Sequence, residues 1–249
     1  MPQLSVVIPA YNEADRIGAN LREVAQYLAD NKIDAEIVVV SDASTDDTVD
    51  IVQAYIDEGP DCTIRLLRQE TNRGKGAAVR RGMLEATGDV RMFMDADLAT
   101  PVEEIGKLLP RVEHSPVVIA SRAVHSSHLD KKQPFHRQVM GWVFRQLVSW
   151  AGVYGVRDSQ CGFKLFRADA AKDIFEHQKE IGFAFDVELL ALAARFGHRV
   201  DEVGVSWHDS GRSSVNPILD PIRMFLCLIR IRWRCTFGDL RKIAGEEKN

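Results

Sequence analysis

Two aspartates one residue apart, Asp95 and Asp97, are the residues of this sequence best suited to chemistry. They follow the apolar run Val90–Met94, which predicts a buried parallel strand, and they precede Pro101, which is typical of a helix start. Both carboxylates are therefore expected at the carboxyl end of a strand, where open α/β sheets bind ligands. Buried carboxylates need a compensating cation, and Mg²⁺ or Mn²⁺ shared with substrate phosphates meets that need. The pair predicts a metal and diphosphate site, although such triplets are also common on surfaces.

A glycine-rich run, residues 72–76 (NRGKG), is a second candidate for anion binding. Gly74 and Gly76 let backbone amides approach a phosphate, and Lys75 adds a positive charge. The run has neither the spacing of a Walker A loop nor that of a dinucleotide-binding fingerprint, which counts against nucleotide kinases and dehydrogenases. A tight turn shaped by the two glycines is the alternative interpretation.

The elements that must position these residues repeat a strand–helix pattern. Apolar runs rich in β-branched residues predict strands, and the apolar spacing after the first of them, at Ile17, Leu21, Val24 and Leu28, predicts a helix. Four strand–helix units in about a hundred residues predict a Rossmann-like, mostly parallel α/β sheet with right-handed crossovers and helices on both faces. The loops at the carboxyl ends of its strands then share one crevice. The expected strands are 4–9, 36–40, 63–67, 90–94, 116–120 and 200–207, with further helices at 48–56 and 77–86.

Length and composition limit the classes of protein. A chain of 249 residues is long enough for one α/β domain, and its net charge of −4 gives no global attraction to nucleic acid. The four cysteines lack C-x-x-C spacing and no signal peptide precedes the first strand, which predicts reduced thiols in a cytoplasmic protein. No uncharged apolar run approaches the roughly 20 residues of a spanning helix.

Five groups of residues, taken in order, resemble the inverting glycosyltransferases of family two, which have the GT-A fold. Four of them are residues 9–13 (PAYNE), the turn at Asp42, residues 72–76 and the triplet at 95–97. The fifth, 158–166 (DSQCGFKLF), narrows the resemblance to the dolichyl-phosphate β-glucosyltransferase branch, sister to the dolichyl-phosphate mannose synthases. The resemblance runs from Leu4 to about Trp233.

The resemblance implies a set of donor-binding residues. Asp42 would accept a hydrogen bond from the base or ribose, and Asp95 and Asp97 would face the diphosphate through Mg²⁺ or Mn²⁺. The mannose synthases carry a glutamine two residues past the second aspartate, where this sequence has Ala99. Thr100 or water would then complete the metal site. The implied nucleotide-sugar set is Pro9, Tyr11, Asn12, Glu13, Val40, Asp42, Arg73, Gly74, Lys75, Asp95, Ala96 and Asp97.

A second implied set faces the acceptor. Arg122, at a predicted strand end, resembles the family arginine that meets the diphosphate or the acceptor phosphate; a solvated surface arginine is the alternative. Asp186 or Glu188 takes the place of the catalytic carboxylate of soluble-acceptor relatives, unless Asp186 caps a helix or pairs with an arginine. His125 and His128 are expected to be solvated loop residues. The acceptor-phosphate set is Arg122, Gln160, Lys164, Arg212 and Ser213, and the catalytic set is Asp95, Asp97, Arg122, Lys164 and Arg212.

Two stretches, 134–153 and 216–249, suggest contact with lipid. Each predicts a helix with a wide apolar arc, tryptophans and arginines, the features of a helix lying in a membrane interface. We expect a GT-A domain over 1–215 that includes the first helix, and a C-terminal interface segment over 216–249. Packing of both helices on the core or on a second subunit is the alternative, and a homo-oligomer or an integral membrane partner is compatible with either.

The resulting hypothesis is metal-dependent transfer of glucose from UDP-glucose to a polyprenyl (dolichyl-type) phosphate at the cytoplasmic membrane face, with inversion. Such a phosphate has its second pKa near 6, so it needs cations rather than a strong general base. One alternative is GDP-mannose as donor, and another is a soluble carbohydrate acceptor with Asp186 as base. A non-catalytic nucleotide-sugar binder is the rival from a different class.

Overall fold

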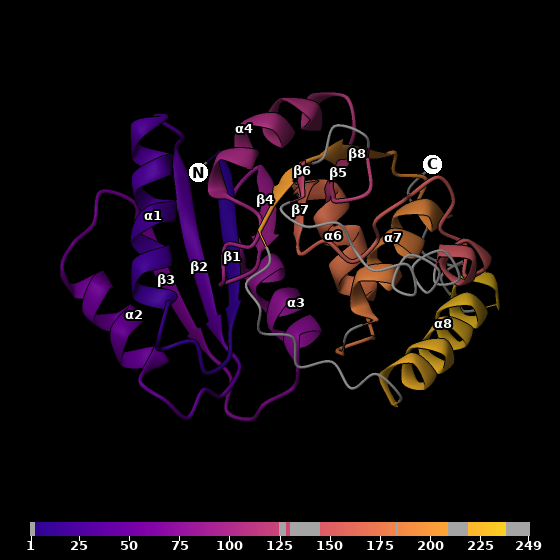
Figure 1. Cartoon of the computed structure of the whole chain (residues 1–249), viewed down its shortest axis with the longest axis horizontal. Coiled ribbons are helices and arrows are strands. Elements are labelled where there is room, and N and C mark those ends of the chain that lie inside the picture. Colours follow the sequence, from indigo (N-terminus) through magenta and orange to yellow (C-terminus); the bar gives the residue numbers. More distant parts are fainter. Residues whose placement is uncertain (1–2, 125–127, 130–144, 183, 209–218, 238–249) are drawn as a thin grey trace, which may run out of the picture.

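A computed structural model describes residues 3–124, 128–129, 145–182, 184–208 and 219–237. Its centre is a seven-stranded sheet in the order β3-β2-β1-β4-β7-β5-β8, and a two-stranded sheet pairs β6 with β9 (Figure 1). Only β7 in the large sheet runs antiparallel to its neighbours. The strands are β1 Leu4–Ala10, β2 Ala35–Ser41, β3 Thr63–Arg68, β4 Val90–Met94, β5 Val117–Ser121, β6 His128–Leu129, β7 Phe163–Arg167, β8 Val200–Gly204 and β9 Ser206–Trp207.

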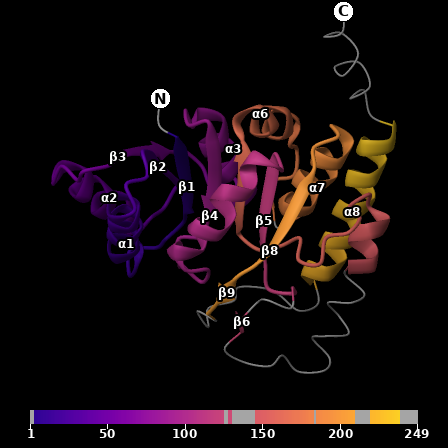
Figure 2. The ribbon, with the colours of Figure 1, turned by 90° about the horizontal axis from the view of Figure 1, so that it is seen from above.

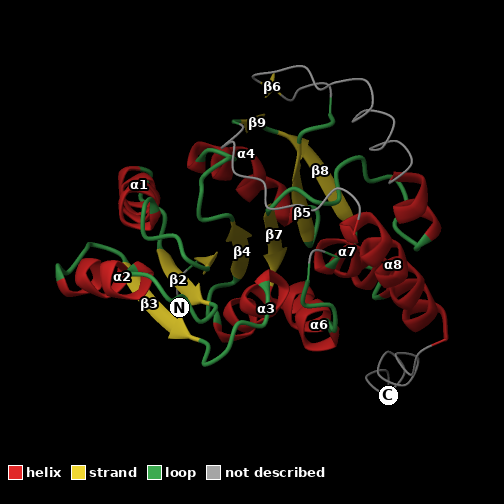
Figure 3. Cartoon of the chain, turned by 60° about the horizontal axis from the view of Figure 1, so that its bottom comes forward, coloured by secondary structure: helices red, strands yellow, loops and turns green. Residues whose placement is uncertain are grey.

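Helices cover both faces of the sheet, which confirms the predicted α/β class (Figure 2). One face carries α1 Ile17–Asp30, α2 Thr48–Asp57 and α4 Ile105–Leu108, the last flanked by the 3₁₀ turns η1 Val102–Glu104 and η2 Leu109–Glu113. The other face carries α3 Lys75–Glu85, α6 Ala168–His177 and α7 Phe185–Arg195. Helix α8, Leu219–Phe237, packs on the outside of α7 (Figure 3).

The central strands are buried because each face of the sheet has its own apolar core. In β1, Val6 and Ile8 face α1, whereas Val7 faces α3, as the two-residue period of a strand requires. Gly82 of α3 lets that helix approach the sheet closely, since a Cβ there would lie 2.3 Å from Cγ1 of Val7. The loops after β1, β2 and β4 therefore extend from a sheet that is packed against helices on both faces.

Strand β7 is the element that the sequence analysis did not predict. Residues 158–166 are not among the expected strands, but Phe163–Arg167 lies between β4 and β5, with Lys164 opposite both Phe93 and Ile119. A five-residue strand with a lysine at its second position gives no clean strand pattern. Its insertion brings the loop 158–162 against the end of β4.

Helix α8 packs against the rest of the protein along one face and is exposed along the other. Leu228 and Ile231 are fully buried against the core around α7, whereas Phe225, Trp233 and Phe237 are exposed. The expected boundary between 215 and 216 falls outside the described residues, as do 134–144 of the first expected interface helix. Within the described ranges, no helix is long and apolar enough to cross a bilayer.

Candidate active site

The turn after β4 holds Asp95 and Asp97 in one orientation. Leu98 adopts a positive φ of 50°, which closes a tight turn in which its N–H donates to the Asp95 carbonyl at 3.3 Å. The N–H of Ala99 donates to Oδ1 of Asp97 at 3.1 Å. From α1, the Asn20 amide donates to the Ala96 carbonyl at 2.7 Å. The triplet is therefore tied down at its middle residue as well as at its end.

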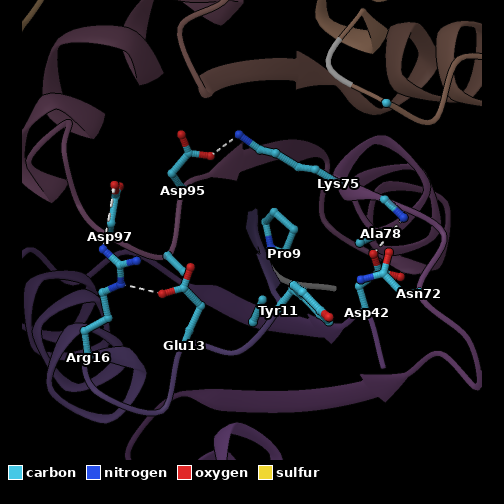
Figure 4. Close-up of a pocket in the computed structure, with 14 residues that line it drawn as sticks. Pro9, Tyr11, Glu13, Arg16, Asp42, Asn72, Lys75, Ala78, Asp95 and Asp97 are labelled. Carbon is cyan, nitrogen blue, oxygen red and sulfur yellow. Dashed lines mark hydrogen bonds and ion pairs between the residues drawn. The ribbon is translucent and has the colours of Figure 1, made fainter. Parts of the chain in front are cut away.

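Two pockets meet at these aspartates. The larger, of about 400 Å³, is lined by loops after β1, β2 and β4 and by the start of α3 (Figure 4). The smaller, of about 130 Å³, lies toward β5 and β7. Asp95 and Asp97 line both pockets. The larger is lined by Pro9, Ala10, Tyr11, Glu13, Arg16, Asp42, Asn72, Gly74, Lys75, Ala78, Asp95, Ala96, Asp97 and Gly182, and the smaller by Asp95, Asp97, Ala99, Thr100, Arg122, Gln160, Cys161, Gly162 and Trp207.

Asp42 organises the far wall of the larger pocket. Its Oδ1 accepts from the Gln69 amide at 2.9 Å and from the Arg73 N–H at 2.8 Å, and its Oδ2 accepts from the Gly74 N–H at 2.7 Å. Asp42 is 3 % exposed. The carboxylate therefore shapes the glycine-rich loop, in addition to any contact with a nucleoside, which stays a prediction.

Three residues of the implied donor set do not line the larger pocket. Val40 is fully buried in the core against α3. Asn12 is exposed, and its side-chain carbonyl accepts from the Thr45 N–H at 2.8 Å, which pins one loop to another. Arg73 is exposed and contributes its backbone N–H to Asp42. These three residues are therefore placed to support the wall of the pocket without lining it.

A charged row crosses the larger pocket (Figure 4). Glu13 pairs with Arg16, and Nη1 of Arg16 lies 4.0 Å from Oδ2 of Asp97. On the opposite side, Nζ of Lys75 contacts Oδ1 of Asp95. Each aspartate therefore has one cation beside it.

The two carboxylates fit a divalent cation that also binds a diphosphate. Oδ1 of Asp95 is buried, and the ion pair with Lys75 compensates its charge. Across the described ranges, no cluster of three or more His, Cys, Asp or Glu side chains is arranged to hold a metal. Two carboxylates with the remaining positions left to phosphate and water is the arrangement that Mg²⁺ favours. The residues present therefore suit Mg²⁺ or Mn²⁺ only together with a phosphate ligand.

The smaller pocket is cationic on one side. Arg122, directly after β5, donates from Nε to Oδ2 of Asp158 at 2.7 Å and from Nη2 to Oδ1 at 2.9 Å. Its guanidinium carbon lies 5.5 Å from the centre of the Trp207 ring. Burial alone would lower the pKa of Arg122, but the hydrogen bonds to Asp158 outweigh burial and raise the pKa. Arg122 is therefore a fixed, permanent cation at this pocket, with Gln160 beside it.

Cys161 cannot act as a base in the smaller pocket. Burial raises the pKa of its thiol to about 11, so the thiol is protonated at neutral pH. Thr100 lies 3.8 Å from its sulfur. Of the described side chains that line this pocket, only those of Asp95 and Asp97 are carboxylates.

Lys164 and Asp186 form a buried ion pair behind the pockets. Nζ of Lys164 lies 2.5 Å from Oδ1 of Asp186 and donates to the Cys161 carbonyl at 2.6 Å. The Lys164 side chain is fully buried and lines neither pocket, so its expected role toward the acceptor phosphate stays a prediction. The Glu188 carboxylate is also fully engaged. Its Oε1 lies 3.3 Å from Nη1 of Arg234, and its Oε2 accepts hydrogen bonds from the N–H groups of Lys179 and Glu180. Neither Asp186 nor Glu188 is an available base.

Replacing Lys164 with methionine is expected to lower the free energy of unfolding by about 3–5 kcal/mol, because the buried carboxylate of Asp186 loses the cation that it contacts directly. Urea unfolding followed by circular dichroism measures the change. The double variant K164M/D186L removes both charges and should recover most of the loss. A single variant as stable as the wild type would show that the pair does not stabilise the fold. If the double variant is stable but inactive, the ion pair is needed for activity as well as for stability.

Some predicted residues cannot be placed. Arg212 and Ser213 lie outside the described residues, as does His125, and the His128 side chain is not described. Their roles stay predictions.

Five residues of the site were missed by sequence reasoning, and three of them carried a signal. Arg16 stands three residues after Glu13, the spacing of partners on one helix face. Asp158 and Gly162 lie in the 158–166 run that carries the family resemblance, of which only Gln160 and Lys164 were predicted to belong to the site. Asn20 and Trp207 gave no signal beyond polarity or aromaticity.

The sequence and the fold match known proteins. A family model described as Glycosyl transferase family 2 matches residues 5–175. A dolichyl-phosphate β-glucosyltransferase of Dictyostelium discoideum is 36% identical over 246 residues, covering 94% of this chain and 75% of that protein. The proteins of the same name from Saccharomyces cerevisiae and Homo sapiens are 35% and 34% identical, covering 96% of this chain and 76% and 78% of theirs.

Solved structures share the fold at lower identity. Glucosyl-3-phosphoglycerate synthase from Mycobacterium tuberculosis, crystallised with Mn²⁺, UDP and phosphoglyceric acid, superposes with a TM-score of 0.68 at 21% identity. The match covers 96% of this chain and 80% of that one. TarS of S. aureus, residues 1–349, superposes with a TM-score of 0.56 at 21% identity, covering 81% and 58%. These likenesses establish the GT-A architecture.

Proposed function

Because this chain belongs to glycosyl transferase family 2, and is therefore a glycosyltransferase, we propose that it transfers glucose from UDP-glucose to a polyprenyl phosphate of dolichyl type. The names of its relatives support the acceptor and the sugar. The donor is proposed to bind in the larger pocket and the acceptor phosphate in the smaller one, with Asp95 and Asp97 between them.

The observation that supports a phosphate acceptor is the composition of the smaller pocket, whose described lining has a cationic side chain and no evident general base. The smaller pocket presents Arg122, held by Asp158, and its described lining has no carboxylate besides Asp95 and Asp97 and no ionisable thiol. A hydroxyl acceptor needs a general base to remove its proton, whereas a phosphate monoester is largely dianionic at neutral pH. A pocket of this composition therefore suits a phosphate.

The displacement needs little from the protein beyond placement and charge. An oxygen of the acceptor phosphate forms the new bond to the anomeric carbon from one face, and the bond to UDP breaks on the other, with UDP taking the electron pair. Arg122 offsets repulsion between the two anionic substrates, and Asp97 and Asp95 would hold the metal. When bound, Mg²⁺ or Mn²⁺ supplies a Lewis acid that neutralises charge on the departing diphosphate. Attack from the opposite face inverts the anomeric centre.

A soluble carbohydrate acceptor is the weaker alternative. It would use Asp186 as base, but Asp186 is 5 % exposed and pairs with Lys164. GDP-mannose as donor stays an alternative, because the residues that line the larger pocket do not distinguish uracil from guanine by themselves. Crystals of a structural relative with Mn²⁺ or Mg²⁺ and UDP support the uridine donor.

The proposed place of action is the cytoplasmic face of a membrane, and the exposed apolar side chains of α8 support contact with a membrane surface. Trp233 is 64 % exposed, and Arg232 lies over the ring of the neighbouring exposed Trp150 at 4.6 Å. Aromatic side chains beside arginines suit the boundary between acyl chains and anionic headgroups. Co-sedimentation with anionic vesicles tests this part, and a protein left in the supernatant at low salt would argue against it.

The function is tested by product analysis with a matrix of donors and acceptors. UDP-glucose and GDP-mannose are each offered with a polyprenyl phosphate, a soluble sugar phosphate and a neutral soluble sugar. We expect one main product, β-glucosyl polyprenyl phosphate, only with UDP-glucose and with Mg²⁺ or Mn²⁺ present. Transfer to the neutral sugar at an equal rate would overturn the acceptor assignment. Product from GDP-mannose alone would overturn the donor assignment.

A further inference from the structure

Lys75 occupies the place next to Asp95 where a positive charge is needed. Its Nζ contacts Oδ1 of Asp95. Figure 4 shows the lysine extending from the start of α3 to the aspartate at the end of β4. Both side chains of this ion pair are about one-third exposed, so another cation can replace the lysine.

The position of Lys75 in its helix argues that charge, not stability, keeps it there. It is the first residue of α3, where the partial positive charge of the helix disfavours a lysine. Its side chain is one-third exposed and flexible.

We propose that Lys75 is the resident counterion of Asp95, which a divalent cation must displace, and that this makes metal and sugar nucleotide bind cooperatively. The inference rests on the proposed function, because it requires Asp95 and Asp97 to hold the metal. Without a metal, Lys75 contacts Asp95, and Arg16, which also pairs with Glu13, lies 4.0 Å from Asp97. With a metal, the ammonium group loses its partner and needs another anion.

A diphosphate in the larger pocket provides that anion. Lys75 and the two aspartates line the same pocket, so a pyrophosphate bound to the metal would be within reach of the lysine ammonium group. Metal alone must displace Lys75 without compensation, whereas metal with nucleotide offers Lys75 a new partner. Because coupling between two ligands is reciprocal, the nucleotide then raises metal affinity by the same factor as metal raises nucleotide affinity.

Binding of Mn²⁺, measured by the electron paramagnetic resonance signal of the free ion, tests the proposal with and without UDP. Replacing Lys75 with methionine keeps the length of the side chain and removes its charge. We expect K75M to bind Mn²⁺ about tenfold more tightly than the wild type when UDP is absent. We also expect the enhancement of Mn²⁺ affinity by UDP to fall by a similar factor. K75R, which keeps the charge, should behave like the wild type.

The control is K107M, which removes another lysine paired with a carboxylate, that of Glu104, outside both pockets. It should leave Mn²⁺ affinity unchanged. Mn²⁺ binding by K75M that is equal to or weaker than that of the wild type, with UDP absent, would overturn the inference alone. A wild-type protein that binds no Mn²⁺ even with UDP would overturn both the inference and the metal part of the proposed function. Thermal unfolding of each variant verifies that it is folded.

Discussion

Glucosyl transfer is expected to fall about 10³-fold when Asp97 is replaced by asparagine, a loss of about 4 kcal/mol of transition-state stabilisation. The amide keeps the shape of the side chain, and its oxygen can still accept from the Ala99 N–H. It loses the negative charge that would hold the divalent cation against the leaving diphosphate. Initial rates with saturating Mg²⁺ measure the effect, and Mn²⁺ binding in the presence of UDP should weaken in parallel.

A matched control is available in Asp201 of β8, which pairs with Arg111 and lines neither pocket. D201N changes the same chemistry at a different place and should retain near wild-type rates. Wild-type transfer by D97N would remove the metal role from this aspartate. An equal loss in D201N would mean that the assay reports folding rather than the site.

Replacing Gly162 with alanine is expected to lower the transfer rate about 10²-fold, because displacing a catalytic group by about 1 Å has that effect. A Cβ at this position would lie 2.2 Å from Oδ2 and 2.5 Å from Cγ of Asp95, closer than any normal contact. The aspartate or the loop before β7 must therefore move. Gly162 lines the smaller pocket, so the acceptor side of the site moves as well. Initial rates, with circular dichroism to check the fold, measure the effect.

Gly106 of α4 provides the control, since a Cβ there meets only the Tyr27 hydroxyl at 3.2 Å. G106A should leave transfer unchanged, and alanine also favours a helix over glycine. If G162A retains the wild-type rate and Mn²⁺ affinity, the carboxylate of Asp95 tolerates displacement and its proposed role as a ligand is wrong.

The parallel half of the fold could be predicted from the sequence because its signals are local. The strands β1 to β4 are short β-branched runs, and their helices follow at the spacing of a strand–helix repeat. Parallel pairing with short connections leaves few arrangements, and all of them gather the strand ends at one edge. For that reason the sequence alone could assign Asp42, Lys75, Asp95 and Asp97 to one pocket.

The second half could not be predicted in the same way, because its pairing is long-range. Strand β7 joins β4 and β5 in antiparallel register, and nothing local to Phe163–Arg167 announces that insertion. The side to which Lys164 turns depends on that register, since a shift by one residue would exchange its place with Phe163. The same pairing sets Gly162 against Asp95 and Asp158 against Arg122.

By itself, the sequence determined the class of fold, the edge of the sheet that binds ligands and the two aspartates at its centre, because periodicity and strand-end chemistry act over a few residues. Only the tertiary structure decided which charged groups remain available to a substrate. Asp186, Glu188 and Lys164 pair with residues of other elements and line neither pocket, whereas Arg122, which pairs with Asp158, lines the smaller one. The physical reason is that burying a charge requires a counter-charge, and the partner that supplies it is chosen by contacts between residues far apart in the chain.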